Sequence, residues 1–338
     1  MFDRIAPMPH SKLPISVAMC TYNGEKYLRE QLQSIAAQTR LPDEMVVCDD
    51  GSSDATPEII EEFARSAPFP VRFIRNPQNL GSTKNFEKAI GLCTGDLIAL
   101  CDQDDIWLPE KLARQAEMME GDPSLGGVFS DAELIDDASA PIGKRLWDSI
   151  LFMPRDRKRF QAASGIDVLL RCNVVTGATL MVRASLRSLF MPIPTTWVHD
   201  GWIALQTVFY AQLRSVEEPL LEYRIHANQQ IGIKNSTHFL PPTLRERLEK
   251  GKREEPGNQL AHAHELNQLA QWMSARKDAR SEAALLAVRR TSRFYADRAG
   301  PYTSRLAHLA SILRNTANYH RYEDGWRCLV RDIVLVFI

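Results

Sequence analysis

Short apolar segments alternate with helical patterns along the first part of the chain. Apolar side chains recur at spacings of four and three residues, as at Leu28, Leu32 and Ile35, which predicts helices between those segments. Thr56 followed by Pro57 is typical of a helix start. The segments predicted to be buried strands are residues 15–20, 45–48, 71–74 and 97–100. Strands that alternate with helices predict an α/β fold with a mostly parallel central sheet and flanking helices.

The second half of the chain is less regular. Residues 174–182 are predicted to form one buried strand, and residues 220–224 a short one. A helix is expected to begin at His199 and to continue through Val208. From about residue 243 the composition shifts to Lys, Arg, Glu, Ala and Leu, which favours helix. We therefore expect one domain over residues 1–240 and a helical C-terminal region over residues 241–338.

Polar clusters follow three of the predicted strands at their carboxyl ends. They are residues 21–23, residues 49–54 and the acidic residues 102–105. In parallel sheets ligands bind beyond these strand ends. Clustered carboxylates suit a hard divalent cation, which commonly shares its coordination with a phosphate. The alternatives are an ordinary turn at residues 49–54 and a solvated acidic turn or helix cap at residues 102–105.

Composition excludes several classes of protein. The 338 residues are 44% hydrophobic and 25% charged, with a formal net charge of −1, which is typical of a globular protein and not of a nucleic-acid binder. The six cysteines form no Cys-x-x-Cys pair, so buried thiols in a reducing cytoplasm are expected. There is no signal-like segment and no apolar run long enough to span a bilayer. Neither the dinucleotide fingerprint nor the P-loop sequence is present.

These motifs together resemble the family 2 glycosyltransferases, which have the GT-A fold. The resemblance runs from Ile15 to about Gly232 and implies a nucleotide-sugar half over residues 12–130 and an acceptor half over residues 131–240. The motifs that carry it are Thr-Tyr-Asn-Gly at 21–24, Asp-Asp-Gly-Ser-Ser-Asp at 49–54, Asn-Leu-Gly at 79–81 and Asp-Gln-Asp-Asp at 102–105. Residues 199–202 and 223–228 are similar to bacterial rhamnosyltransferase-type members.

The resemblance implies roles for individual residues. Asp102, Asp104 and His226 would hold Mg²⁺ or Mn²⁺, whereas Asp105 is expected to face away from the ion. Asp200 is the candidate general base, although aspartate there also suits a helix cap. The residues expected to bind the nucleotide sugar are Thr21, Asn23, Glu25, Asp49, Asp50, Lys84, Asn85, Asp102 and Gln103. Those expected to line the acceptor pocket are Trp107, Thr176, Gly177, His199, Trp202 and Arg224.

Several of these residues have a structural alternative. Lys84 is equally typical of a solvated surface lysine, and an isolated histidine such as His226 is more often structural than a ligand. Arg224 is expected to pair with an internal acid such as Glu222 rather than with phosphate. Tryptophans occur as often in a core as on a pocket wall.

The expected function is inverting, metal-dependent transfer of a sugar from a nucleoside diphosphate, with dTDP-rhamnose as the preferred donor. The expected acceptor is a saccharide or lipid-linked saccharide of bacterial surface polysaccharide synthesis. A nucleotidyltransferase and a catalytically inactive scaffold are the alternatives. The last segment, residues 325–338, is apolar with a tryptophan and two arginines, which is typical of an interfacial helix. We expect the protein in the cytoplasm, with this segment on the inner membrane face, on the catalytic domain or on a second subunit of a homo-oligomer.

Overall fold

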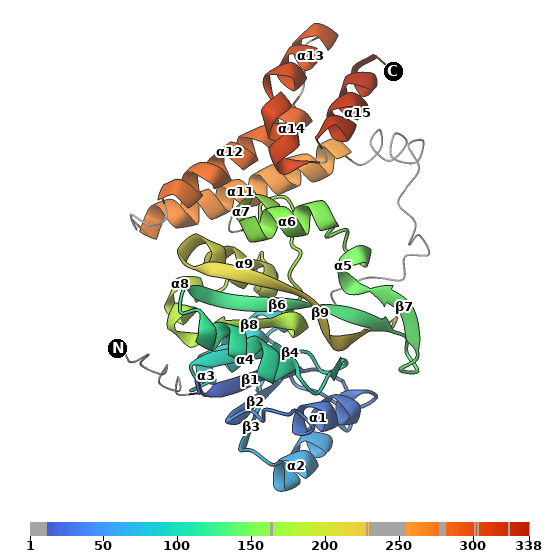
Figure 1. Ribbon diagram of the computed structural model, residues 1–338, viewed down its shortest axis with the longest axis vertical. Helices are drawn as coiled ribbons and strands as arrows, with labels where there is room; N and C mark the ends of the chain where they lie inside the picture. The colour runs from blue at the N-terminus through green and yellow to red at the C-terminus, as the bar shows by residue number, and fades with distance from the viewer. Residues whose placement is uncertain are drawn as a thin grey trace, which may run out of the picture. The chain divides into compact units, whose positions relative to one another are not determined.

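Four parallel strands of the computed structural model organise the candidate site. They are β1 (Ile15–Thr21), β2 (Glu44–Asp49), β3 (Val71–Arg75) and β4 (Leu97–Cys101). They lie in the order β3-β2-β1-β4, and Figure 1 shows them side by side. The register pairs Thr21 with Asp49, and Met19 with Cys101. The polar residues that follow β1, β2 and β4 therefore meet at one edge of the sheet.

The other strands extend this sheet to nine. They are β5 (Ile106–Trp107), β6 (Leu125–Ile135), β7 (Pro141–Arg145), β8 (Leu180–Arg183) and β9 (Gln212–Arg224). The strand order continues β4-β8-β6-β9-β5, with β7 pairing with β6. Strand β8 is antiparallel to both of its neighbours, whereas β6 and β9 are parallel. The sheet confirms the predicted α/β class.

The prediction of one strand over residues 174–182 is wrong. Only Leu180–Arg183 is a strand, and it follows a 3-10 turn, η1 (Gly177–Thr179). This turn packs against β4, and the extended backbone of β8 begins only after it. The short strand predicted over residues 220–224 is the end of the much longer β9.

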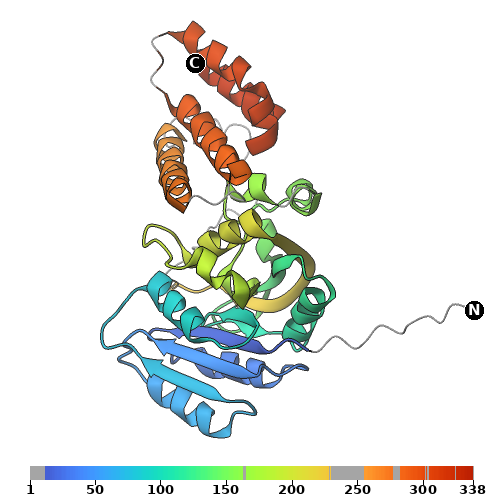
Figure 2. The ribbon, with the colours of Figure 1, turned by 90° about the vertical axis from the view of Figure 1, so that its left-hand side faces the viewer.

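Helices cover the sheet in the first part of the chain (Figure 2). They are α1 (Leu28–Ala36), α2 (Thr56–Ser66), α3 (Ser82–Leu92), α4 (Lys111–Gly121), α5 (Leu146–Ser149), η2 (Ala184–Leu186), α8 (Arg187–Phe190) and α9 (His199–Tyr210). Helix α3 packs on β1 and β2, α2 on β3, and α4 on β6. The apolar residues that predicted α1, Leu28, Leu32 and Ile35, are all buried.

The described residues form two compact units. The first contains the described parts of residues 1–151, 175–207 and 211–232, and the second those of residues 152–174, 208–210 and 233–338. The residues that the structure describes are 12–162, 165–227, 229, 255–276, 282–300, 302, 304–323 and 325–337. The predicted domain boundary near residue 240 lies outside them, so the domain limits stay a prediction.

The second unit is helical. It contains α6 (Pro154–Ala162), α7 (Ile166–Leu169), α11 (Glu255–Arg276), α12 (Glu282–Ala299), α13 (Arg305–Arg314), α14 (Thr316–Tyr322) and α15 (Trp326–Phe337). Helix α11 packs along α12, and α13 along α15. The acid of α15, Asp332, points inward and accepts hydrogen bonds from Arg298 at 2.9 Å and Tyr319 at 2.5 Å. Among the described residues, no helix has the length and apolar character needed to cross a membrane.

A lysine lies in the core of the first unit, beneath the acidic cluster. Lys111 is fully buried, its Nζ donates to Gln115 at 3.0 Å, and it lies 4.3 Å from the centre of the Trp107 ring. Burial lowers the pKa of Lys111 to about 7. Trp107 is only 2% exposed, so the structure places it in the core and not on a pocket wall.

The buried Lys111 predicts a pH-dependent stability. Its pKa falls on folding, so the unfolded chain binds more protons above pH 7 and the burial of this lysine opposes folding. We expect Lys111→Met to raise the free energy of unfolding by about 2 kcal/mol at pH 7, because it removes the cost of burying the amine. The gain should shrink by pH 9, because the cost of deprotonating the lysine on folding falls as the pH rises from 7 towards its ordinary pKa of 10.5. Thermal denaturation at both pH values measures it.

Lys12→Met, at an exposed position, is the matched control and should change the free energy of unfolding at neither pH. Destabilisation by Lys111→Met at both pH values would show instead that the amine is needed in its charged form.

Candidate active site

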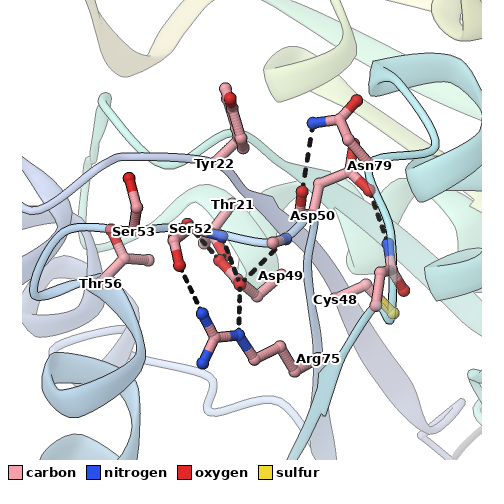
Figure 3. Close-up of polar contacts among 12 residues, drawn as sticks. Thr21, Tyr22, Cys48, Asp49, Asp50, Ser52, Ser53, Thr56, Arg75 and Asn79 are labelled. Carbon is pink, nitrogen blue, oxygen red and sulfur yellow. Dashed lines mark hydrogen bonds and ion pairs between the residues drawn. The ribbon is translucent and has the colours of Figure 1, made fainter.

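The loop after β2 is held by the first of its two aspartates. Asp49 is fully buried and accepts from the Thr21 hydroxyl at 2.9 Å and from the backbone N–H of Ser52 at 2.9 Å. The Nε atom of Arg75 lies 3.7 Å from its Oδ2 (Figure 3). These bonds explain the short polar sequence after β2, because a carboxylate at the strand end turns the chain. Thr21 and Asp49, both predicted to bind the donor, thus bind each other.

The second aspartate holds a different loop. Asp50 Oδ1 accepts from the Leu80 N–H and from the Asn76 amide, each at 2.8 Å, and Oδ2 accepts from the Gly81 N–H at 2.9 Å. The Asn79 amide also donates to the Asp50 carbonyl at 3.1 Å (Figure 3). Asp50 thus anchors the segment ahead of α3. A carboxylate has about four acceptor positions, so Oδ2 retains capacity for a ligand N–H.

Two more predicted residues join the loops after β1 and β2. The Asn23 side chain accepts from the Ser53 N–H at 2.9 Å, with Asn23 itself in the left-handed region at φ 48°. Glu25 accepts from the Ala55 N–H at 2.9 Å. Both side chains therefore connect the loop after β1 to the loop after β2 by hydrogen bonds.

The predicted residues of α3 are also bonded within the protein. The Lys84 ammonium donates to Glu87 at 2.9 Å and to the Ile193 carbonyl at 2.8 Å. Asn85 is buried and donates to the Cys48 carbonyl at 2.8 Å. A free phosphate-binding cation is therefore not seen at Lys84.

Gln103 joins the acidic loop to the loop after β1. Its amide accepts from the Tyr22 N–H at 2.8 Å and donates to the Tyr22 carbonyl at 3.0 Å. Gly24 lies against it, since a Cβ atom there would come within 2.3 Å of the Gln103 amide oxygen. The two loops are therefore in direct contact.

Three carboxylates converge beyond the end of β4. Burial, followed by the negative charges of Asp104 and Asp200, raises the pKa of Asp102 to about 8. A backbone hydrogen bond from Ala178 acts in the opposite direction. His226 Nε2 lies 2.9 Å from Asp104 Oδ2. The structure thus brings together Asp102, Asp104, Asp200 and His226, which are more than 120 residues apart in sequence at their extremes.

Asp105 has a hydrogen-bond partner of its own, Arg224. It is buried, and its Oδ1 accepts from the Arg224 N–H at 3.1 Å. The Arg224 side chain is itself fully buried and pairs with Glu30 at 2.6 Å while donating to the Asp104 carbonyl at 2.7 Å. Arg224 therefore supports the acidic loop from within the protein, with Glu30 as its acid in place of the expected Glu222.

The donor set fits a hard divalent cation in its chemistry. Among the described residues, no three His, Cys, Asp or Glu side chains stand as a ready-made metal site. The crowding that raises the pKa of Asp102 is nevertheless the charge that a cation would offset. Mg²⁺ commonly takes one or two carboxylates and completes its shell with substrate phosphates and water. The two carboxylates of Asp102 and Asp104, with His226 beside Asp104, agree with that pattern.

The general-base candidate lies at the start of α9. Asp200 Oδ2 accepts from the Gly177 N–H at 3.0 Å, and the first turn of a helix stabilises a negative charge. Its neighbour His199 is buried and stacks on Phe86 at 3.9 Å between ring centres. Neither ring nitrogen of His199 has a hydrogen-bond partner among the described residues, and burial lowers its pKa. His199 is thus a neutral packing ring beside the carboxylate.

The remaining pocket predictions have different outcomes. Gly177 lies against His199, since a Cβ atom there would come within 2.8 Å of Nε2. Thr176 precedes it and its carbonyl accepts from the Thr179 N–H at 2.9 Å. Trp202 is fully buried and donates to the Phe190 carbonyl at 2.8 Å, so it is a core residue and not a pocket wall.

Sequence reasoning missed two of the residues that shape the site. Asn76 directly follows β3 and joins Asp50 to Asn85, so the strand-end rule that found the other clusters would have found it. Glu30 gave no such signal, because its partner Arg224 lies 194 residues away.

Comparison with known proteins finds a family model over part of the chain. Residues 16–166 match the model of glycosyl transferase family 2. The fold is of the GT-A type. The chain covers 90% of residues 1–349 of TarS from Staphylococcus aureus, solved with UDP-GlcNAc, over 94% of its own length, with a TM-score of 0.53 and 17% identity. That likeness concerns the fold.

The chain is also similar to curated proteins. An uncharacterized glycosyltransferase of Nostoc is 28% identical over 237 residues, which are 67% of this chain and 69% of the relative. An uncharacterized protein of Mycobacterium tuberculosis is 29% identical over 217 residues, 63% of this chain. The chain spans 59% of the length of that mycobacterial relative.

The close contact at Gly177 predicts a sensitive position. Gly177→Ala should displace His199 and with it the hydrogen bond from the Gly177 N–H to Asp200. We expect kcat/KM for sugar transfer to fall at least about tenfold, because small displacements of a reacting group are costly. Gly121→Ala is the matched control, since a Cβ atom there meets nothing within 4 Å. Equal activity of the two variants would contradict a role for this contact.

Proposed function

We propose that this protein transfers a sugar from a nucleoside diphosphate to an acceptor hydroxyl with inversion at the anomeric carbon. The observation that carries the proposal is the convergence of Asp102, Asp104 and Asp200 beyond the strand ends of a domain whose residues 16–166 match the family 2 model. It provides two carboxylates for the departing diphosphate and one for the attacking hydroxyl. Each piece lies at the edge where parallel sheets bind ligands.

The chemistry follows from the different surroundings of these carboxylates. Asp200 takes the proton of the acceptor hydroxyl, whose oxygen then bonds to the anomeric carbon as the bond to the diphosphate breaks. A single displacement inverts the configuration at that carbon. The Gly177 N–H donates to Asp200 Oδ2 at 3.0 Å and the Gly201 N–H to Oδ1 at 2.5 Å, and these two bonds fix the orientation of the carboxylate that receives the proton.

Asp102 and Asp104, with His226 beside Asp104, would hold Mg²⁺ or Mn²⁺. The ion would supply positive charge to the diphosphate oxygens, where negative charge grows during the reaction. The carboxylates themselves repel a diphosphate, so this part of the site favours donor binding only when their charge is offset.

The donor and the acceptor are the less constrained parts of the proposal. Our preferred donor is dTDP-rhamnose, on the resemblance of residues 199–202 and 223–228 to rhamnosyltransferase-type sequences. TarS was solved with UDP-GlcNAc, which makes a uridine nucleotide the natural competitor. The proposed acceptor is a saccharide or lipid-linked saccharide of surface polysaccharide synthesis. Oligomerisation and association with the inner membrane face also stay predictions.

The alternatives differ in what they ask of these residues. In a nucleotidyltransferase the attacking oxygen of the substrate bonds to phosphorus. Such an enzyme therefore has no need of a base opposite a sugar carbon. An inactive scaffold would need neither the base nor the metal carboxylates, yet the structure brings Asp102, Asp104 and Asp200 together at the cost of mutual repulsion.

Asp200→Asn tests the base. The amide keeps the size of the side chain but cannot take a proton, so transfer should fall by about 10²–10⁴ while donor binding changes little. Transfer to an oligosaccharide and binding of the donor by calorimetry measure the two effects. Asp96→Asn, at an exposed aspartate just before β4, is the matched control. Full transfer activity of the Asp200 variant would remove Asp200 as the base.

A panel of nucleotide sugars tests the donor and the metal together. We expect dTDP-rhamnose to raise the melting temperature more with Mn²⁺ than without it, because a ligand that binds the folded state stabilises it. At a hundredfold excess over Kd the stabilisation is about 2.7 kcal/mol. UDP-GlcNAc, GDP-mannose and dTDP-glucose complete the panel.

Asp104→Asn should abolish the part of the rise in melting temperature that depends on Mn²⁺, whereas Asp96→Asn should leave that part unchanged. A larger effect of another nucleotide sugar would replace the proposed donor. Equal shifts with and without Mn²⁺ for every donor would contradict the metal site.

A further inference from the structure

A cationic pocket lies within the helical unit, between α12, α13 and α14. Its volume is about 420 Å³. Among its lining residues are Arg290, Arg293 and Asp297 from α12, Arg314 from α13, and Asn315 and Asn318 from the start of α14. The lining thus carries three positive charges and a single carboxylate. Polar amides complete a surface that can donate hydrogen bonds from several directions.

The arginines of this pocket lack the partners that structural arginines have nearby. The side chain of Arg298, the residue after Asp297 on α12, is largely buried and pairs with Glu323 at 2.6 Å and Asp332 at 2.9 Å. By contrast, Arg290 and Arg293 have no ion-pair partner within the described part of the chain. Arg314 donates only to the carbonyl of its own helix, at Ala310. Three guanidinium groups around one hollow whose lining has Asp297 as its single carboxylate repel one another, and an anion would offset that repulsion.

The wall of the pocket is ordered by its own contacts. The Tyr302 hydroxyl donates to Ser311 at 2.9 Å, and the Tyr302 ring stacks on His308 at 4.2 Å between ring centres. Phe294 at the base of the pocket is buried against Tyr319. The pocket is therefore shaped by packed side chains and not by a loop alone.

We propose that this pocket binds a phosphate-bearing anion. The planar guanidinium group matches phosphate oxygens with paired N–H donors. The amide side chains of Asn315 and Asn318 in the pocket lining supply further donors. A volume of about 420 Å³ exceeds that of a single phosphate, so there is room for the group that carries it. The site lies within the second unit and needs none of the residues of the candidate active site.

Two sources can supply such a phosphate: the headgroup of an anionic lipid, or a soluble phosphorylated metabolite. Exposed apolar side chains occur on α13 and α15 of the same unit, namely Leu306, Leu313, Trp326, Val330 and Phe337. The exposed surface of α15 carries no acid, because Asp332 is turned inward. Vesicle binding therefore also tests the predicted interfacial role of the C-terminal helix.

The test uses the full chain with two probes, vesicles of phosphatidylglycerol mixed with phosphatidylcholine, and inorganic pyrophosphate. The pocket variant is Arg290→Ser with Arg293→Ser, and the matched control is Arg289→Ser with Arg305→Ser, which removes the same charge from positions outside the pocket lining. We expect binding of at least one probe to weaken about a hundredfold in the pocket variant, roughly tenfold for each arginine. The control should weaken it less than threefold.

The two probes separate the sources. Loss of vesicle binding with no affinity for pyrophosphate identifies a lipid headgroup, and saturable pyrophosphate binding identifies a soluble ligand. Equal losses in the pocket variant and the control would show non-specific attraction and overturn the proposal, as would binding of neither probe. Arg290→Lys with Arg293→Lys keeps the charge and should weaken binding by an intermediate factor, which guards against a folding defect in the serine variant.

Discussion

Parallel pairing of β1 with its two neighbours, β2 and β4, is the constraint on which the candidate site depends. It puts three carboxyl strand ends at one edge, where each strand releases its chain into a polar loop. The loops then bond to one another instead of to water: Thr21 to Asp49, Tyr22 to Gln103 and Asn23 to Ser53. A change of register between these strands would separate all of these pairs together.

The candidate site combines hydrogen-bonded loops with a cluster of carboxylates that is electrostatically unfavourable. Most of the predicted donor-binding residues are already hydrogen-bonded within the protein, so they hold the loops after β1, β2 and β4 in place. The centre is different, because burial and the nearby carboxylates of Asp104 and Asp200 make the charged form of Asp102 unfavourable. Such a cluster of buried carboxylates does not stabilise the folded protein. It is typical of sites whose ligand completes the charge balance. Rigid walls around an unbalanced centre are what selective binding of a charged donor requires.

Local sequence patterns predicted the parts of the fold that are themselves local. The first four strands, the helices between them and the acidic ends follow from apolar spacing and turn residues. Strand β6 and most of β9 were not predicted, because their pairing joins segments about ninety residues apart and their sequences mix apolar and polar residues. Residues 174–182 had the composition of a strand, but the 3-10 turn at Gly177 depends on packing against α9, which no local pattern records.

The candidate site shows the same division between residue type and residue role. Sequence alone placed Asp102, Asp104, Asp200 and His226 in one site, and the structure brings them together. It did not reveal that Trp107 and Trp202 lie in the core or that Arg224 pairs with Glu30, because burial and long-range pairing are properties of the assembled chain. The contact between Gly24 and Gln103 has a consequence for how such a sequence can change over evolutionary time. A larger residue at position 24 requires the Gln103 side chain to turn away or to become smaller, which would break its hydrogen bonds to Tyr22, so these two positions are expected to vary as a pair rather than one at a time.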